Sequence, residues 1–345
     1  MPAAVFFHDC GLNAIIDTVS IQNVYDNDCK ALNQLAAGPG TESKMDFRGI
    51  IPPAITPVND DHSIDEDGFA NVIEYMIENG VHGIIVGGTT GEFYTLSAEE
   101  RVRQFQFAKQ VINGRVQFIC GVNDISTKGA CGFAEAARDA GADGLLVAAP
   151  YYSLPTEREN AAHCLAIDKA ANLPIILYNY PGRTGVNMGE EFLALVSESP
   201  NFCCIKESSG DIDRLHLLAN NYPSIDLSCG AEEQALEFFV WGAKSWVTPM
   251  GNFFAEEVVA MYETCATEQN FAKARRIMAA LLPLTTVLEG GGQLIQCTKF
   301  ACQHFGLPAG TVRPPMKPLD ESAKGDLQDV LNAARSEIQA ILSEA

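Results

Sequence analysis

The sequence predicts an α/β protein built on a (β/α)8 TIM barrel with a C-terminal three-helix extension. Three observations carry this prediction. Eight short apolar runs alternate with amphipathic segments over roughly 220 residues, polar residues gather where those runs end, and strand-like runs stop beyond Glu268. Eight strand and helix units favour the barrel over a doubly wound sheet, which needs a topological switch point and usually has fewer units.

The apolar runs begin shortly after Met45, which opens the regular part of the chain. Their length and composition are typical of strands that are covered on both faces. Strands are therefore expected at 50–56, 83–87, 117–121, 144–148, 174–178, 202–207, 225–229 and 245–249.

Helix signals separate the strands. Asn79 and Gly80 form a helix stop, and the segments that begin at Ser97 and Thr156 each open with a capping box. Barrel helices are expected near 65–78, 97–111, 127–140, 156–171, 189–198, 211–221, 232–241 and 255–267. Three added helices are expected near 270–288, 293–305 and 320–343.

The predicted organisation has three parts. Residues 45–268 are expected to form the barrel and residues 269–345 the C-terminal helical region. Residues 1–44 are expected to be a poorly ordered extension of unknown role. They hold five acids and two lysines, and they lack the basic start and long apolar core of a signal peptide.

Composition limits the classes of partner. The chain has 44 acidic and 23 basic residues and a formal charge of -21, which argues against nucleic acid or an anionic membrane surface. The chain has 11 cysteines, an odd number, and no CxxC motif. We therefore expect reduced thiols in a cytoplasmic protein. No apolar run is long enough to span a bilayer.

The most informative strand is 202–207, because it carries Lys206 just before a Ser-Ser-Gly turn. A buried ammonium must be paired or lose its proton, and an amine of lowered pKa can form a Schiff base with a carbonyl substrate. Alternation places Cys204 and Lys206 on one face and Glu207 on the other, so Glu207 is not an automatic partner. Taken alone, the stretch is equally consistent with a second interpretation, in which Lys206 lies at a strand end and extends its ammonium group into water.

Other strand ends carry matching chemistry. Gly87 to Glu92 is a small-residue loop whose hydroxyl and N–H groups can hold a carboxylate, and it lacks the ending of a phosphate-binding P-loop. Tyr151-Tyr152 follows strand four, and strand five ends in Tyr178 with Arg183 in the loop beyond. Imine chemistry needs an amine, a proton relay and donors for the substrate's carboxylate.

In their order and spacing, four motifs resemble the dihydrodipicolinate synthase / N-acetylneuraminate lyase family. They are Gly88-Thr89-Thr90-Gly91-Glu92, Tyr151-Tyr152, Tyr178-Asn179-x-Pro181-x-Arg183-Thr184-Gly185 and Ile205-Lys206-Glu207. The resemblance covers about residues 46–340. It implies a class I lyase or aldolase that needs no metal or other cofactor, because its imine is formed on a lysine. It also implies a homo-oligomer, usually a dimer of dimers.

The resemblance also implies roles for individual residues. Lys206 would form the imine with pyruvate or another 2-oxo acid, and Tyr178 would relay protons. The substrate carboxylate would be bound by Thr89 and Thr90, and Thr90 would also join the relay.

Further roles concern the partner subunit and the second substrate. Tyr152 resembles the tyrosine that the synthase branch contributes to this relay across a dimer interface. Arg183 would receive the carboxylate of the second substrate, which is aspartate semialdehyde in the synthase reaction, and the carbonyl of Gly230 would face the substrate.

Two departures from the synthase pattern leave the reaction open. Trp246 is expected at the barrel mouth, where it would alter the pocket volume, and Lys299 follows a segment that lacks the usual Asn-Pro. The alternatives are a dehydratase, deaminase or aldolase of a sugar-derived 2-oxo acid or of a hydroxyproline-derived pyrroline carboxylate.

Two more distant alternatives depend on other features. A metal-dependent aldolase needs clustered ligands, but the six histidines are scattered along the sequence. A catalytically retired oligomer that binds a small acid has no reason to keep Lys206, Tyr178, Thr89 and Thr90 together.

Overall fold

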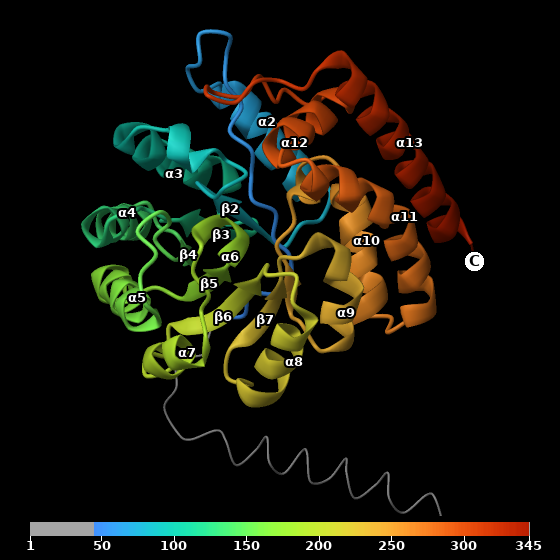
Figure 1. The fold of residues 1–345 in the computed structure, drawn as a ribbon. Coiled ribbons are helices and arrows are strands. Elements are labelled where there is room, and N and C mark those ends of the chain that lie inside the picture. The colour runs from blue at the N-terminus through green and yellow to red at the C-terminus, as the bar shows by residue number, and fades with distance from the viewer. Residues whose placement is uncertain (1–44, 345) are drawn as a thin grey trace, which may run out of the picture. The chain divides into compact units, whose positions relative to one another are not determined.

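The computed structural model describes residues 45–344, and the prediction for residues 1–44 lies outside the described residues. Eight parallel strands form one sheet: β1 (Gly49–Ile50), β2 (Gly83–Val86), β3 (Gln117–Gly121), β4 (Gly144–Ala148), β5 (Ile175–Asn179), β6 (Phe202–Glu207), β7 (Asp226–Cys229) and β8 (Ser245–Trp246). Their order is β1-β8-β7-β6-β5-β4-β3-β2. The predicted (β/α)8 barrel is confirmed (Figure 1).

The barrel closes between β2 and the chain that continues from β1. Ala54 N donates to Ile85 O at 2.8 Å, and Ile85 N donates to Pro52 O at 3.0 Å. The predicted first strand, 50–56, is nevertheless too long, because regular pairing ends at Ile50. Proline has no N–H group, so Pro52 and Pro53 cannot continue a ladder.

Helices separate the strands along the chain and surround the sheet (Figure 1). They are α2 (Glu66–Glu78), α3 (Ala98–Ile112), α4 (Thr127–Asp139), α5 (Glu157–Ala171), α6 (Pro181–Thr184), α7 (Glu190–Val196), α8 (Ile212–Asn221), α9 (Ala235–Val240) and α10 (Ala255–Ala266). Both predicted capping boxes are present, at Ser97 with Glu100 and at Thr156 with Glu159.

Three short 3-10 turns lie in the segments that follow β2, β7 and β8. They are η1 (Phe93–Thr95), η2 (Glu232–Gln234) and η3 (Pro249–Asn252). The predicted helix at 232–241 therefore starts as a 3-10 turn, and the predicted strand 245–249 ends at Trp246. Pro249 again lacks the N–H that a longer strand would use.

The three predicted C-terminal helices are α11 (Phe271–Gly290), α12 (Leu294–His304) and α13 (Glu321–Ser343). They lie on the side of the barrel that carries α9 and α10 (Figure 1). Helix α11 also contacts η2, and α12 contacts η3. Because η2 and η3 follow β7 and β8, this packing brings the end of α11 and the start of α12 to the carboxyl end of the barrel.

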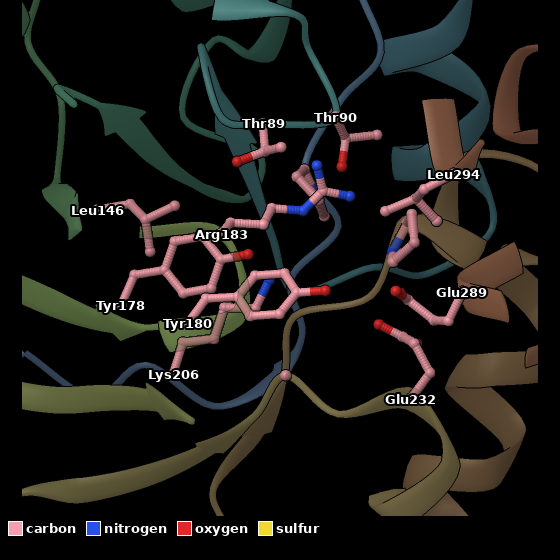
Figure 2. A pocket seen from close by; sticks show the side chains of 13 residues that line it. Thr89, Thr90, Leu146, Tyr178, Tyr180, Arg183, Lys206, Glu232, Glu289 and Leu294 are labelled. Atoms are coloured by element: carbon pink, nitrogen blue, oxygen red, sulfur yellow. The ribbon is translucent and has the colours of Figure 1, made fainter. Parts of the chain in front are cut away.

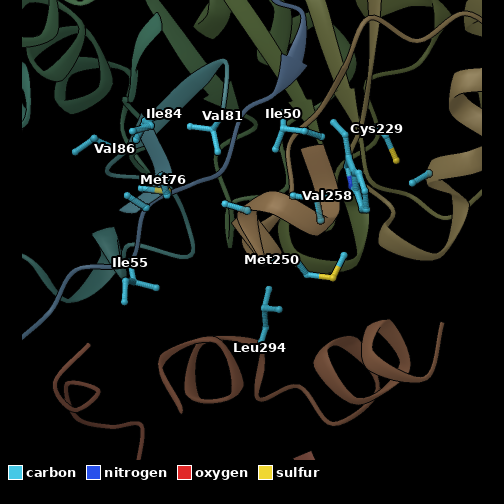
Figure 3. Packing of buried hydrophobic residues seen from close by; sticks show 14 of the residues in the cluster. Ile50, Ile55, Met76, Val81, Ile84, Val86, Cys229, Met250, Val258 and Leu294 are labelled. Carbon is cyan, nitrogen blue, oxygen red and sulfur yellow. The ribbon is translucent and has the colours of Figure 1, made fainter. Parts of the chain in front are cut away.

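Two apolar layers make the core. Alternate strand residues such as Ile85, Ile119 and Leu146 fill the barrel. Ile50 and Ile84 belong instead to the layer between the sheet and its helices (Figure 3). This alternation is what parallel strands with two covered faces require.

The prediction for Trp246 is wrong. Its side chain is fully buried in the outer layer, where its ring packs edge-to-face on Phe239 with 6.5 Å between centroids. The neighbouring residue Val247 belongs to the barrel interior instead. One step along a strand reverses the side chain's face, so Trp246 does not line the barrel mouth.

Eight of the nine cysteines in residues 45–344 are buried, and Cys131 is half-buried. No helix in this range is both long and apolar enough to cross a bilayer.

Candidate active site

A cavity of about 430 Å³, part of it open to solvent, lies at the carboxyl end of the strands. Figure 2 shows side chains from opposite sides of the barrel pointing into it. Its lining residues are Pro53, Thr89, Thr90, Leu146, Tyr178, Tyr180, Arg183, Lys206, Gly230, Glu232, Pro249, Glu289 and Leu294. The structure therefore brings together Lys206, Tyr178, Thr89, Thr90, Arg183 and Gly230, all of which the sequence pointed to.

Lys206 is the amine of this cavity. It stands opposite Tyr178 on the neighbouring strand, and its Nζ lies 4.3 Å from the centre of the Tyr178 ring. Only 7% of the residue is exposed, and it forms no ion pair with a carboxylate of residues 45–344. Burial lowers the pKa of Lys206, although Glu232 and Glu289 oppose that shift. Such an amine loses its proton more readily than an exposed lysine does.

Glu207 lies on the other face of β6, as alternation predicts. Its carboxylate accepts hydrogen bonds from Asn179 Nδ2 at 2.8 Å and from Arg214 Nε at 3.1 Å. These partners tie the ends of β5 and β6 to α8. Glu207 is therefore a structural anchor and not the partner of Lys206.

Gly230 makes room for the lysine. A Cβ atom at this position would lie 2.6 Å from Lys206 Cε and 2.0 Å from Ser208 Oγ. The Gly230 N–H donates to Glu207 O at 2.9 Å, so its backbone is fixed against β6. Any larger residue would displace the Lys206 side chain.

Thr89 and Thr90 enter the cavity from the loop after β2 (Figure 2). A hydrogen bond fixes this loop to the segment after β1, since Thr56 Oγ1 donates to Gly91 O at 2.7 Å. Beyond it, Glu92 adopts a left-handed conformation (φ 55°) and pairs with Lys299 Nζ at 2.5 Å. Lys299 is thus a buried anchor for the threonine loop.

Tyr180 and Arg183 form the wall between this cavity and a second one of about 700 Å³. The Arg183 guanidinium carbon lies 5.5 Å from the centre of the Tyr180 ring. Tyr151 lines the second cavity, and Tyr152 lines neither. Tyr152 is 94% exposed and has a left-handed backbone (φ 72°).

Tyr178 is buried beside the amine. Burial raises the pKa of its hydroxyl, so the group is protonated at neutral pH and can donate a proton as well as accept one. With Lys206 it supplies the pair of groups that carbinolamine dehydration requires.

Two carboxyl groups in the cavity were missed by sequence reasoning. Glu232 is 2% exposed, and burial raises its pKa to about 8. Glu289, at the end of α11, also has a pKa raised by burial. The position of Glu232 just after β7 is a usable sequence signal, whereas nothing in the sequence places a residue of α11 in the barrel mouth.

Metal ligation has no candidate in the described range. Within residues 45–344, no three His, Cys, Asp or Glu side chains come together in a way that could hold a metal ion.

Fold and site together define a (β/α)8 barrel whose cavity is lined by a buried amine, a tyrosine and an arginine, a set suited to small carbonyl acids. Residues 46–334 match the model of the dihydrodipicolinate synthetase family. The 4-hydroxy-tetrahydrodipicolinate synthase of Salinibacter ruber is 39% identical over 303 residues, covering 83% of this chain and 98% of the relative. The chain belongs to the dihydrodipicolinate synthetase family.

Solved structures agree with this membership. The 4-hydroxy-tetrahydrodipicolinate synthase from the methanotroph Methylacidiphilum fumariolicum SolV superposes with a TM-score of 0.82 at 29% identity, covering 86% of this chain and 98% of that one. A prophage protein of the family from E. coli K12, solved in complex with pyruvate, gives 0.80 at 28% identity and covers 84% and 99%.

Proposed function

We propose that this protein is a 4-hydroxy-tetrahydrodipicolinate synthase that joins pyruvate to aspartate semialdehyde through a Schiff base on Lys206. The observation that carries the proposal is the buried Lys206 amine beside Tyr178 in the cavity, which forms no ion pair with a carboxylate of residues 45–344. The relatives named as this synthase, and the family member solved with pyruvate, support the choice of substrates. No metal or other cofactor is required.

The proposed sequence starts with attack of the neutral Lys206 amine on the keto carbon of pyruvate. Tyr178 gives a proton to the departing hydroxyl group, so that water leaves and the iminium forms. The Tyr178 phenolate then takes a proton from the methyl carbon, which gives the enamine and restores the Tyr178 hydroxyl. Thr89 and Thr90 hold the carboxylate of pyruvate during these steps.

The enamine carbon next attacks the aldehyde of the second substrate, whose carboxylate is bound by Arg183. The amino group of that substrate then displaces Lys206 from the imine, closes the ring and regenerates the free amine. The two hydrogens of the neutral amino group go to the Lys206 nitrogen and to the former aldehyde oxygen, so the enzyme returns to its starting state.

The test is turnover of pyruvate with aspartate semialdehyde, with formation of the heterocyclic product followed by NMR. Arg183→Ala should raise the KM for the aldehyde while imine formation with pyruvate persists. Turnover only with larger, sugar-derived oxo acids or with a pyrroline carboxylate would replace the synthase by the dehydratase, deaminase or aldolase alternative. No reaction with any carbonyl acid would support a retired binding protein.

The site also requires a second subunit in this proposal. Tyr152 is 94% exposed in one protomer, which suits a residue that completes the relay of a partner within a homo-oligomer. Mixing Lys206→Ala with Tyr152→Phe subunits should restore part of the activity that each variant lacks alone. Mixed oligomers as inactive as their parents would contradict this role.

The cysteines support a reducing compartment, and we place the protein in the cytoplasm. Burial raises the pKa of Cys164 and Cys302, which keeps these thiols protonated and unreactive. Cell fractionation with an antibody to the chain tests this location.

A further inference from the structure

The cavity holds two carboxyl groups that the proposed reaction has not used. We propose that Glu232 and Glu289 bind the ammonium group of the second substrate, while Arg183 binds its carboxylate, so that the cavity recognises an α-amino acid that carries an aldehyde. This inference rests on the proposed function and names the subsite that would select the second substrate.

Glu232 is held in one orientation. It lies in η2, directly after β7, and its Oε2 accepts a hydrogen bond of 2.6 Å from Thr248 Oγ1 at the end of β8. Both residues are buried, with 2% of Glu232 and none of Thr248 exposed. The carboxyl group is therefore fixed by the barrel itself, facing the cavity.

Glu289 reaches the same space from outside the barrel. It lies in the last turn of α11, which contacts η2. Figure 2 shows the carboxyl groups of Glu232 and Glu289 close together and directed toward the hydroxyl of Tyr180. Lys206 and Arg183 are the cations that act on Glu289, and both lower its pKa against the effect of burial.

A cation is the ligand that this pair lacks. Within residues 45–344 neither glutamate forms an ion pair, and burial without a directly paired cation favours the neutral form of each carboxyl. Lys206 is the one amine in the cavity lining, and its charge disappears when the enamine forms. The carboxyl pair then faces an incoming substrate without that cation.

Arg183 decides what kind of cation fits. It lines the same cavity and forms no ion pair with a carboxylate of the described chain. A guanidinium and two carboxyl groups in one small cavity match a ligand that carries both a carboxylate and an ammonium. An α-amino acid has these two groups on one carbon.

The experiment measures binding of stable probes to the enzyme saturated with pyruvate, by titration calorimetry. L-Homoserine carries a carboxylate, an ammonium and an alcohol in place of the aldehyde. 4-Hydroxybutyrate lacks the ammonium, and L-threonate carries hydroxyl groups instead. L-Homoserine should bind about 10- to 100-fold more tightly than either, the range expected for a charged hydrogen bond.

Substitutions distinguish a loss of ammonium binding from a loss of folded protein. Glu289→Gln should weaken the binding of L-homoserine by about 10-fold or more and leave the affinity for 4-hydroxybutyrate unchanged. Glu232→Gln should change the two affinities in the same direction. Glu237→Gln, at an exposed position of α9, is the matched control and should change neither affinity. Thermal unfolding of each variant shows whether it remains folded.

Proton release gives a second readout. A bound ammonium lowers the pKa of both carboxyl groups, so L-homoserine should release protons near neutral pH, and the heats measured in two buffers should differ. Two results would overturn the inference, provided that pyruvate adducts still form on Lys206. One is that L-threonate binds as tightly as L-homoserine, and the other is that Glu289→Gln leaves the affinity for L-homoserine unchanged. Absence of those adducts would instead overturn the proposed function.

Discussion

Two lysines of residues 45–344 are buried, Lys206 in the barrel and Lys299 in α12, and their surroundings are opposite. Lys299 is 2% exposed, and its Nζ lies 2.5 Å from Glu92 Oε1 and donates to Thr311 O at 2.6 Å. Lys206 is 7% exposed, forms no ion pair within residues 45–344 and lies over the ring of Tyr178. Burial lowers the pKa of both amines, but for Lys299 the adjacent Glu92 opposes the shift directly.

The comparison separates a structural lysine from a reactive one. A buried ammonium that is paired with a carboxylate is held in place, and the carboxylate favours its protonated form. An amine without such a partner is poised to become neutral and to attack a carbonyl carbon. Both lysines serve the same cavity, since Lys299 holds the loop that carries Thr89 and Thr90 through Glu92.

The largest expected effect is that of Lys206→Ala. Removing the amine should abolish turnover altogether, because no other group in the cavity can form the imine. Lys299→Ala should still form product, with an altered KM for the 2-oxo acid. Turnover is measured with both substrates at saturation. Full activity of the Lys206→Ala variant would contradict the Schiff-base mechanism.

Lys299→Met should produce the largest loss of stability. It leaves the buried Glu92 carboxylate without its paired cation, at a cost of about 3–5 kcal/mol in the free energy of unfolding. Urea denaturation measures this loss. The control is Lys324→Met, which breaks an exposed pair with Glu321 and should cost no more than about 1 kcal/mol. Equal effects of the two variants would show that the buried pair is not an anchor.

Tyr178→Phe tests what the hydroxyl adds to the contact with Lys206. The ring over the amine remains, so the protein should fold and bind the 2-oxo acid, while proton transfer slows by about 10²- to 10³-fold in kcat. Tyr222→Phe, on the surface near Glu190, is the control and should leave kcat unchanged. A normal kcat in Tyr178→Phe would assign the relay to another group.

The smallest expected effect concerns the pH dependence of the rate of imine formation. Imine formation needs the neutral amine, so its rate rises with pH and levels off above the pKa of Lys206. Because burial lowers that pKa, the plateau should begin below 10.5, the ordinary value for lysine. Stopped-flow kinetics with pyruvate measures the profile, and a rate still rising above that pH would mean that the amine is not perturbed.

Much of this picture follows from the sequence because its causes are local. Strand alternation assigned Lys206 and Glu207 to opposite faces, and capping boxes located two helix starts. The same alternation, applied to the short final strand, would have turned Trp246 away from the pocket. The prolines at 52 and 53 explain why the first strand is shorter than its apolar run suggests.

Other features depend on tertiary contacts that no local pattern carries. Glu289 enters the cavity only because α11 packs on η2, and Lys299 meets Glu92 from a distant part of the chain. The exposure of Tyr152 likewise follows from the tertiary structure, and no local sequence pattern predicts it.

The most direct measurement is borohydride trapping with pyruvate, followed by intact mass and peptide mapping. The contrast between the two buried lysines predicts one adduct per chain, on Lys206, with Lys299 unmodified. An adduct on Lys299, or none with any 2-oxo acid, would contradict the claim that the unpaired buried amine is the reactive one.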